Sequence, residues 1–151
     1  MIVTICGHKE ILWNDEDKKH TKDVLYALLC ASPNTLFYLG DDGAFDRACN
    51  HILKGLQRDF PKVKRIFVTP YLDPDYLSAR NADETYDEVV YPFCGNVPPR
   101  YAISKRNAWM VDHADLVIAR VDHEWGGAAK TLRLALQKQK RFVNLGKYCV
   151  E

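Results

Sequence analysis

Short apolar runs alternate with amphipathic segments along the chain. Six of the runs are rich in β-branched, aliphatic or aromatic residues and end at glycine, proline or charged residues, a pattern typical of buried strands. We predict strands at residues 2–6, 35–39, 65–69, 88–92, 115–120 and 141–145.

Most intervals between these strands show helical spacing. The clearest helix has apolar residues at positions 45, 48, 49, 52, 53 and 56, which fall on one face of a helix. Further helices are predicted at residues 16–30, from the Pro98-Pro99 pair to about residue 112, and at residues 127–140. Residues 71–87 have no clear period, and two interpretations stay open: a functional loop such as a lid, or a short irregular helix.

Strands that alternate with helices, and that are apolar almost throughout, indicate a parallel sheet covered on both faces. Right-handed crossovers then give an α/β fold, a single doubly wound, mostly parallel, Rossmann-like sheet of about six strands with helices on both faces. A chain of 151 residues fits one domain, residues 1–151. In such folds a ligand binds beyond the carboxyl ends of the strands, at the switch point of the strand order.

Composition and charge narrow the function classes. The net charge of +1 lacks the basic excess typical of nucleic-acid binding, so we do not expect nucleic acid as a partner. Lys9 and Glu10 interrupt the first apolar run too early for a signal peptide, and no apolar window is long enough to span a membrane, so we expect a cytoplasmic protein. The five cysteines are widely spaced and the histidines lack metal-ligand spacing, so we expect reduced thiols, no metal and no resident cofactor.

Three of the predicted strands end in glycine-containing turns. Backbone N–H groups at such turns can approach a ligand closely, and a following helix N-terminus favours an anion. The alternative is that the glycines serve turn geometry alone. On the ligand interpretation, the pocket residues are Gly7, His8, Gly40, Asp42, Gly43, Asp46, Arg106, Asn107, Trp125, Gly126, Gly127 and Lys130.

Several of these side chains have two interpretations. Asp46 accepts hydrogen bonds from ribose hydroxyls or acts as a general base, or it only complements the dipole of its helix. Arg106 and Asn107 clamp a phosphate and a ribose or base edge, or they belong to a solvated helix face. Trp125 stacks on a base or covers the core. The chain has neither GxGxxG nor a P-loop, which disfavours an ordinary dehydrogenase or NTPase.

The order and spacing of six motifs resemble a known family. They are ICGH (5–8), GDDGAFDRA (40–48), VTPY (68–71), KRNAWMVDHADLVIA (105–119), GGAAKT (126–131) and FVNL (142–145). Together they resemble the YpsA-like branch of the SLOG superfamily, whose relatives include the LOG phosphoribohydrolases and the Rossmann-like part of DprA. The resemblance implies a domain that binds nucleotides or derivatives such as ADP-ribose, and it adds Thr131 to the pocket. Tyr71, in the VTPY motif, is a second candidate for stacking on a base.

The chain departs from the family pattern at two turns and on one helix. Asp41 and Asp42 stand where relatives often have Gly or Ala, and we expect them to face ribose, a cation or solvent. Trp125 and Ala128 replace the small and hydroxyl residues of an SGGT turn. LOG enzymes carry a glutamate in PGGxGTxxE, but residues 126–141 contain no acidic residue, so that chemistry does not carry over. The remaining candidate catalytic carboxylates are Asp46, Asp41, Asp42 and Glu124.

The leading hypothesis is a protein that binds, and so senses or sequesters, a nucleotide or a nucleotide-derived small molecule such as an ADP-ribose-like ligand. One alternative is a nucleotide N-glycosidase that releases a free base. Another is a protein-interaction module with a vestigial pocket. A DprA-like role with single-stranded DNA is not expected, because the chain has neither a basic excess nor a further domain. A homodimer or homotetramer is compatible with a Rossmann-like surface.

Overall fold

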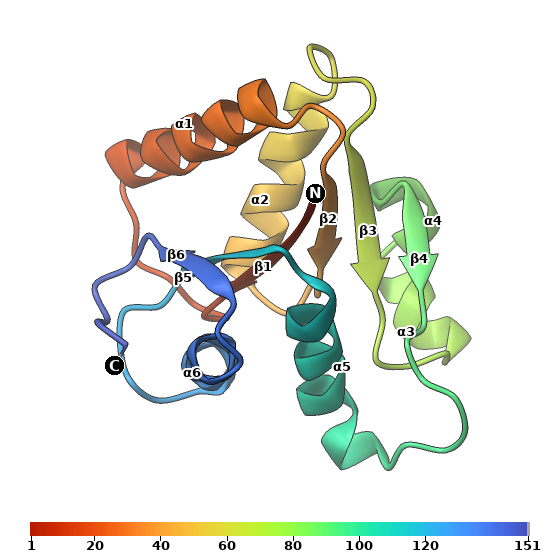
Figure 1. Ribbon diagram of the computed structural model, residues 1–151. Coiled ribbons are helices and arrows are strands. Elements are labelled where there is room, and N and C mark those ends of the chain that lie inside the picture. Colours follow the sequence, from red (N-terminus) through yellow and green to blue (C-terminus); the bar gives the residue numbers. More distant parts are fainter. Residues whose placement is uncertain (151) are drawn as a thin grey trace.

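The computed structural model describes residues 1–150 and contains the predicted alternation of strands and helices (Figure 1). All six predicted strands are present, with ends within two residues of the expected ones. The elements are, in order, β1 (Ile2–Gly7), α1 (Asp15–Ala31), β2 (Leu36–Leu39), α2 (Ala44–Leu56), β3 (Lys64–Val68), α3 (Pro74–Ala79), α4 (Ala82–Thr85), β4 (Glu88–Val90), α5 (Pro99–His113), β5 (Leu116–Arg120), α6 (Gly127–Gln137) and β6 (Arg141–Asn144).

The strands form one sheet in the order β4-β3-β2-β1-β5-β6, and every pairing in it is parallel. From β1 the chain builds outward to β4, then crosses back to the other side of β1 and adds β5 and β6. This is the doubly wound arrangement that the sequence predicts, and it confirms the fold class. The switch point lies between β1 and β5, where Gly7 pairs with Arg120 at the carboxyl edge.

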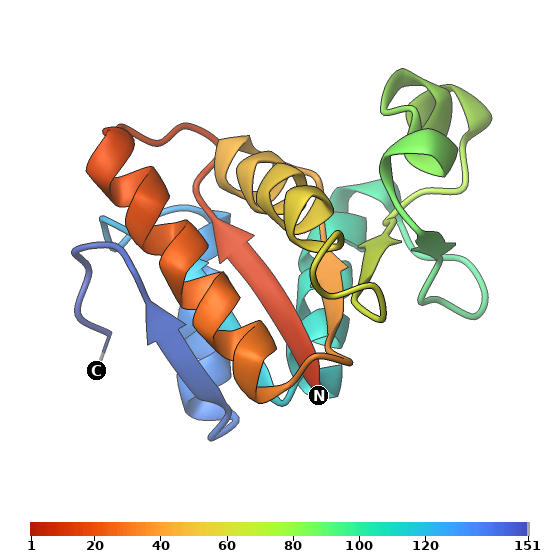
Figure 2. The ribbon, with the colours of Figure 1, turned by 90° about the horizontal axis from the view of Figure 1, so that it is seen from above.

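Helices cover both faces of the sheet (Figure 2). Side chains of β1 alternate between the two sides: Val3 and Ile5 belong to the core under α1 and α2, whereas Cys6 belongs to the core under α5 and α6. The first core is the larger and includes Phe37 and Phe45, both fully buried. None of the helices in residues 1–150 combines the length and apolar composition that a membrane crossing requires.

Residues 71–87 form the two short helices α3 and α4, so the helical interpretation of this segment holds in place of a loop. Asp73 caps α3 by accepting a hydrogen bond from the Asp75 N–H at 2.8 Å. The ring of Tyr86, directly after α4, packs on the ring of Phe67 in β3, with 5.1 Å between the ring centroids. Helices of six and four residues are too short to show a hydrophobic period, which explains why the sequence pattern was ambiguous.

The first and last long helices begin in different ways. At α1 the Asn14 side chain accepts from the Asp17 N–H and the Asp17 carboxylate accepts from the Asn14 N–H, which is a capping box. At α6 the N-cap is Gly126, and within residues 1–150 no side chain caps the helix and its first turn has no acidic residue. The first N–H groups of α6 are therefore without side-chain partners at the carboxyl edge of the sheet.

Candidate functional site

A cavity of about 520 Å³ lies at the switch point, beyond the carboxyl end of β1. Its walls come from β1, the start of α2, the middle of α5 and the start of α6. Nine of the predicted pocket residues line it: Gly7, His8, Asp42, Asp46, Arg106, Asn107, Gly126, Gly127 and Thr131. We call this space the switch-point cavity.

Other predicted residues lie outside this cavity. The Tyr71 hydroxyl donates to the Pro99 carbonyl at 3.0 Å, which holds that ring against the start of α5. Lys130 lines a groove beside the cavity, and Trp125 is 67% exposed. Glu124 is exposed, and its backbone carbonyl accepts a hydrogen bond from Arg133. None of these four residues lines the switch-point cavity, and their roles in ligand binding or catalysis stay predictions.

The glycines of the first two turns are explained by packing. A Cβ atom on Gly7 would lie 2.5 Å from the Cβ of Phe45, the second residue of α2. A Cβ atom on Gly43 would lie 2.5 Å from the Cα of Lys9, in the turn after β1. Both positions need glycine because the two turns approach each other closely. At these two turns the geometric interpretation is sufficient.

The glycines of the third turn face open space. A Cβ atom on Gly126 or Gly127 would meet no atom within 4 Å. Gly126 has a φ of 94°, a conformation that favours glycine, and it directs the chain into α6. Both glycines line the switch-point cavity, so the unpaired N–H groups of the first turn of α6 are accessible to a ligand.

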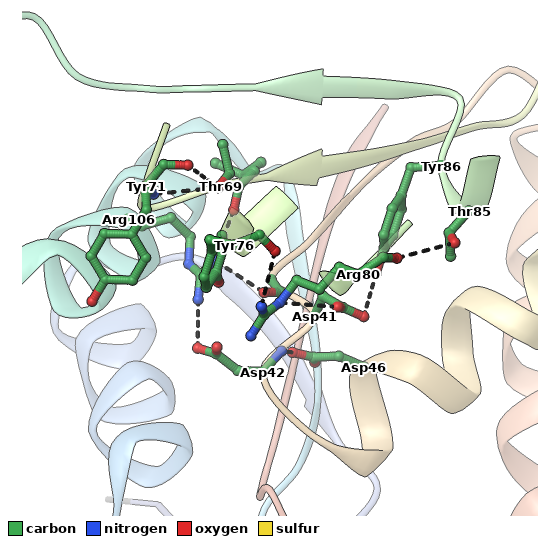
Figure 3. A network of polar contacts seen from close by, with 12 residues as sticks. Asp41, Asp42, Asp46, Thr69, Tyr71, Tyr76, Arg80, Thr85, Tyr86 and Arg106 are labelled. Atoms are coloured by element: carbon green, nitrogen blue, oxygen red, sulfur yellow. Dashed lines mark hydrogen bonds and ion pairs between the residues drawn. The ribbon is translucent and has the colours of Figure 1, made fainter. Parts of the chain in front are cut away.

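Arg106 is fully buried and joins three segments of the sheet edge (Figure 3). Its Nη1 donates to the Gly40 carbonyl at 3.1 Å and to the Val68 carbonyl at 2.7 Å. Its Nη2 pairs with Asp42 Oδ2 at 2.6 Å, and its Nε donates to Asn107 Oδ1 at 2.9 Å. The solvated-face interpretation is therefore wrong for Arg106. Because these four bonds occupy most of its donors, its first role is to hold the β2 and β3 ends together.

The two adjacent aspartates point to different arginines (Figure 3). Asp42 pairs with Arg106, whereas the buried Asp41 accepts from the Tyr86 hydroxyl at 2.6 Å and lies 3.4 Å from Arg80 Nε. Asp41 has a φ of 54°, and this left-handed turn sends the two side chains apart. Both carboxylates thus face a cation, which is a side chain of the protein itself.

Asp46 differs from its two neighbours because its charge has no close cation partner. Its carboxyl group is buried, and Oδ2 accepts only a long 3.4 Å hydrogen bond from the Asp42 N–H. Oδ1 is buried without a hydrogen-bond partner among residues 1–150, yet the residue lines the cavity. Burial raises the pKa of Asp46 to about 7, and the positive charge of Arg106 opposes that rise. Near neutral pH this group can either accept or donate a hydrogen bond.

Three stacked rings connect the cavity with the surface. The rings of His8 and His123 stack at 3.7 Å between centroids, and the rings of His123 and Trp125 stack at 3.7 Å as well. His8 Nε2 accepts the Asp122 N–H at 3.0 Å, so the neutral ring carries its proton on Nδ1. Burial, and next the charge of His123, lowers the pKa of His8. His123 also lines the cavity but was not among the predicted pocket residues. Its position two residues before Trp125 was the only feature of the sequence that pointed to it.

A second space continues the cavity between α5 and α6. It has a volume of about 630 Å³ and shares Ile103, Asn107, Gly127 and Thr131 with the switch-point cavity. We call it the α5–α6 groove. Its basic lining residues are Arg100, Lys130 and Arg133.

Known proteins resemble the chain mainly in fold. No family model matches the sequence. The uncharacterized SPbeta prophage-derived protein YoqJ of Bacillus subtilis (strain 168) is 27% identical over an alignment that covers 58% of this chain and 59% of YoqJ. DNA processing protein A (DprA) of Helicobacter pylori is 18% identical with a TM-score of 0.64, covering 95% of this chain and 64% of that one. DprA of Streptococcus pneumoniae is 17% identical with a TM-score of 0.67, covering 94% and 49%.

At these identities the DprA structures show the fold alone, which is Rossmann-like. The SLOG superfamily and its YpsA-like branch stay predictions. The chain spans 59% of YoqJ, 64% of the Helicobacter pylori DprA chain and 49% of the Streptococcus pneumoniae DprA chain. The activities of those longer proteins are therefore not assigned to this chain on the basis of the comparisons.

The expectation that nucleic acid is not a partner is wrong. The DprA of Helicobacter pylori, whose fold the chain shares, is described by its single-stranded DNA binding mode. The net charge was a poor guide because it sums all charges of the chain and says nothing about where they lie on the surface. Acidic residues gather elsewhere, as in the first turn of α1, while three cations line the α5–α6 groove. A local excess of this kind attracts phosphates even when the net charge is near zero.

We expect Arg106→Lys to destabilise the protein strongly. A lysine ammonium keeps the charge but cannot reach two carbonyls, a carboxylate and an amide at once, so the free energy of unfolding should fall by about 2–4 kcal/mol. Urea unfolding of the variant measures this. Arg58→Lys, at an exposed position without a side-chain partner in residues 1–150, is the matched control. A value for Arg106→Lys within the error of the control would contradict the role assigned here.

We also expect Asp46→Asn to change how stability depends on pH. The folded pKa of about 7 lies above the ordinary value of 3.8, so the folded protein holds the proton of Asp46 more tightly than the unfolded chain does. The stability that this proton gives is fully present below about pH 4 and is lost as pH rises through 7. The asparagine variant should therefore gain a few kcal/mol relative to wild type between pH 4 and pH 8. Urea unfolding at both pH values measures the difference, with Asp23→Asn on the surface of α1 as control. An equal difference at both pH values would disprove the assignment.

Proposed function

We propose that the protein binds a nucleotide, or a nucleotide unit of a larger molecule, in the switch-point cavity. One observation carries the proposal: Asp46, which has a buried carboxyl oxygen without a partner, and the uncapped start of α6 line the same cavity. The volume of about 520 Å³ fits within the range of small-molecule sites.

The phosphate end of the ligand belongs at α6. The first N–H groups of this helix are uncapped, Gly126 and Gly127 leave them accessible, and the helix dipole favours an anion. Residues 126–141 contain no carboxylate to oppose it. His8, with its Nδ1 proton, supplies a further donor at the cavity wall.

The sugar belongs at Asp46 and Asn107. An ionised carboxylate repels phosphate but accepts hydrogen bonds from ribose hydroxyls, so Asp46 suits the sugar and not the phosphate. The Asn107 carbonyl oxygen is occupied by Arg106, which leaves its amide N–H groups as donors. For the base, Tyr71 is held at Pro99, whereas the outer face of Trp125 is exposed beside the cavity. We therefore assign base stacking to Trp125.

The comparisons support this ligand class without naming the ligand. A nucleotide unit is common to the single-stranded DNA bound by Helicobacter pylori DprA and to the ADP-ribose-like ligands that the SLOG resemblance implies. Sensing or sequestration of such a ligand, a single domain over residues 1–151, the cytoplasmic location and a homo-oligomer stay predictions.

Gly127→Asp is the direct test of the phosphate position. The new side chain meets open space, so the fold should hold, but its carboxylate would stand at the helix N-terminus and repel the ligand. We expect the affinity for AMP, ADP-ribose and a short oligodeoxythymidylate, measured by calorimetry, to fall by about tenfold or more in whichever of them binds. Gly55→Asp, also in open space but on α2, is the matched control. Equal affinity in both variants would refute the placement.

A nucleotide N-glycosidase is the second candidate, and the pKa of Asp46 favours it. A carboxyl group with a pKa of about 7 in a cavity can take a proton from water as that water attacks the sugar C1′. The base then leaves with the electrons of the broken C1′–N bond and takes up a proton, which the same carboxyl group can return. Cys6 also lines the cavity, but burial raises the pKa of its thiol and keeps it neutral. We expect Asp46→Asn to retain ligand binding and to abolish any release of free base, followed by chromatography. Release at the wild-type rate would exclude Asp46.

A further inference from the structure

The α5–α6 groove begins where the proposed phosphate position ends. Gly127 and Thr131, in the first turns of α6, line both the switch-point cavity and the groove. Asn107 of α5 also lines both. An extended ligand can therefore pass from one space into the other along the start of α6.

All charged residues that line the groove are basic. Arg100 and Lys130 line it, and their charges have no ion-pair partner among residues 1–150, while Arg133 donates only to the backbone carbonyl of Glu124 at 2.6 Å. The guanidinium of Arg100 lies over the ring of Tyr101 at 4.7 Å, which limits its conformations. Within the described chain no aspartate or glutamate lines the groove. One exposed cation binds phosphate weakly, but three around a concave surface reinforce one another.

The switch-point cavity, unlike the groove, has carboxylates in its lining. Asp42, Asp46 and Glu10 line it together with the cation Lys9, and Asp42 is paired with Arg106. A ligand with a phosphate at the start of α6 therefore meets carboxylates as well as cations in the cavity, but cations without carboxylates in the groove. A second phosphate is favoured on the groove side.

We propose that the α5–α6 groove is a second phosphate subsite, so that the ligand carries at least two phosphate groups. This inference rests on the proposed function, since it takes the first phosphate to lie at α6. The chemical class is a nucleotide with a second phosphate, joined through a pyrophosphate, as in ADP-ribose, or through a phosphodiester, as in a single strand. AMP, which has one phosphate, would occupy the switch-point cavity and leave the α5–α6 groove empty.

The test compares three ligands and two charge-matched double variants. Calorimetry gives the dissociation constants of AMP, ADP-ribose and 5′-phosphorylated thymidine dinucleotide. In the wild type, we expect at least one of the two-phosphate ligands to bind about tenfold more tightly than AMP. Arg100→Gln with Lys130→Gln should reduce that ratio to about threefold or less and should flatten its dependence on salt. Lys19→Gln with Lys22→Gln, on the exposed surface of α1, removes the same charge and should keep the ratio.

Each outcome bears on the subsite. A gain for ADP-ribose alone assigns a pyrophosphate, and a gain for the dinucleotide alone assigns a phosphodiester. AMP binding without a gain for either ligand, or a gain that survives in the Arg100 and Lys130 variant, overturns the subsite and leaves the proposed function standing. Binding of none of the three ligands overturns both. Lost affinity in Gly127→Asp but not in Gly55→Asp shows that the measured binding occurs at α6.

Discussion

The carboxyl edge of the sheet depends on the buried guanidinium of Arg106. A buried charge costs several kcal/mol unless hydrogen bonds compensate for it, and Arg106 has four such bonds. Through them α5 is tied to the ends of β2 and β3, and Gly40 has no side chain because a Cβ atom would lie 3.0 Å from this guanidinium. With those ends held, Asp42 in the β2–α2 turn and Asp46 in the first turn of α2 line the switch-point cavity.

The arrangement of charges around that turn distinguishes three acidic residues that lie within six positions of one another. Asp41 pairs with Arg80 and Asp42 pairs with Arg106, so each has a cation. Asp46 has none close by and is buried, which leaves it partly protonated near neutral pH. Across the cavity, α6 begins without a cap or an acidic residue. In the proposed function, the carboxyl group of Asp46 takes the sugar of the ligand and the uncapped N–H groups of α6 take its phosphate.

The distribution of charge, more than its total, decides which ligands the surface favours. Lysines and arginines nearly balance the acidic residues over the chain, to a net +1. Yet α1 begins with three acidic residues, whereas the α5–α6 groove on the other face of the sheet is lined by three basic ones. Because charges on the surface act over about one Debye length, roughly 8–10 Å, the groove attracts anions independently of α1.

Local sequence patterns were enough to predict the fold of this protein. The apolar strands and the amphipathic face of α2 are local patterns, and parallel pairing with right-handed crossovers leaves few ways to assemble them. The segment of residues 71–87 stayed open between a loop and a short helix, because helices of six and four residues are too short to repeat a hydrophobic period.

The sequence predicted only part of the candidate site, because the contacts of the site join residues that lie far apart in the sequence. The sequence by itself located the three glycine turns and Asp46, but each glycine fits either a ligand or close packing. Only the tertiary structure separated Gly7 and Gly43, which meet neighbouring atoms, from Gly126 and Gly127, which meet none. It also buried Arg106 against carbonyls 66 and 38 positions away, and it stacked His8 on His123. A residue's type sets what it can bind, but its partners and its exposure arise only when distant segments pack together.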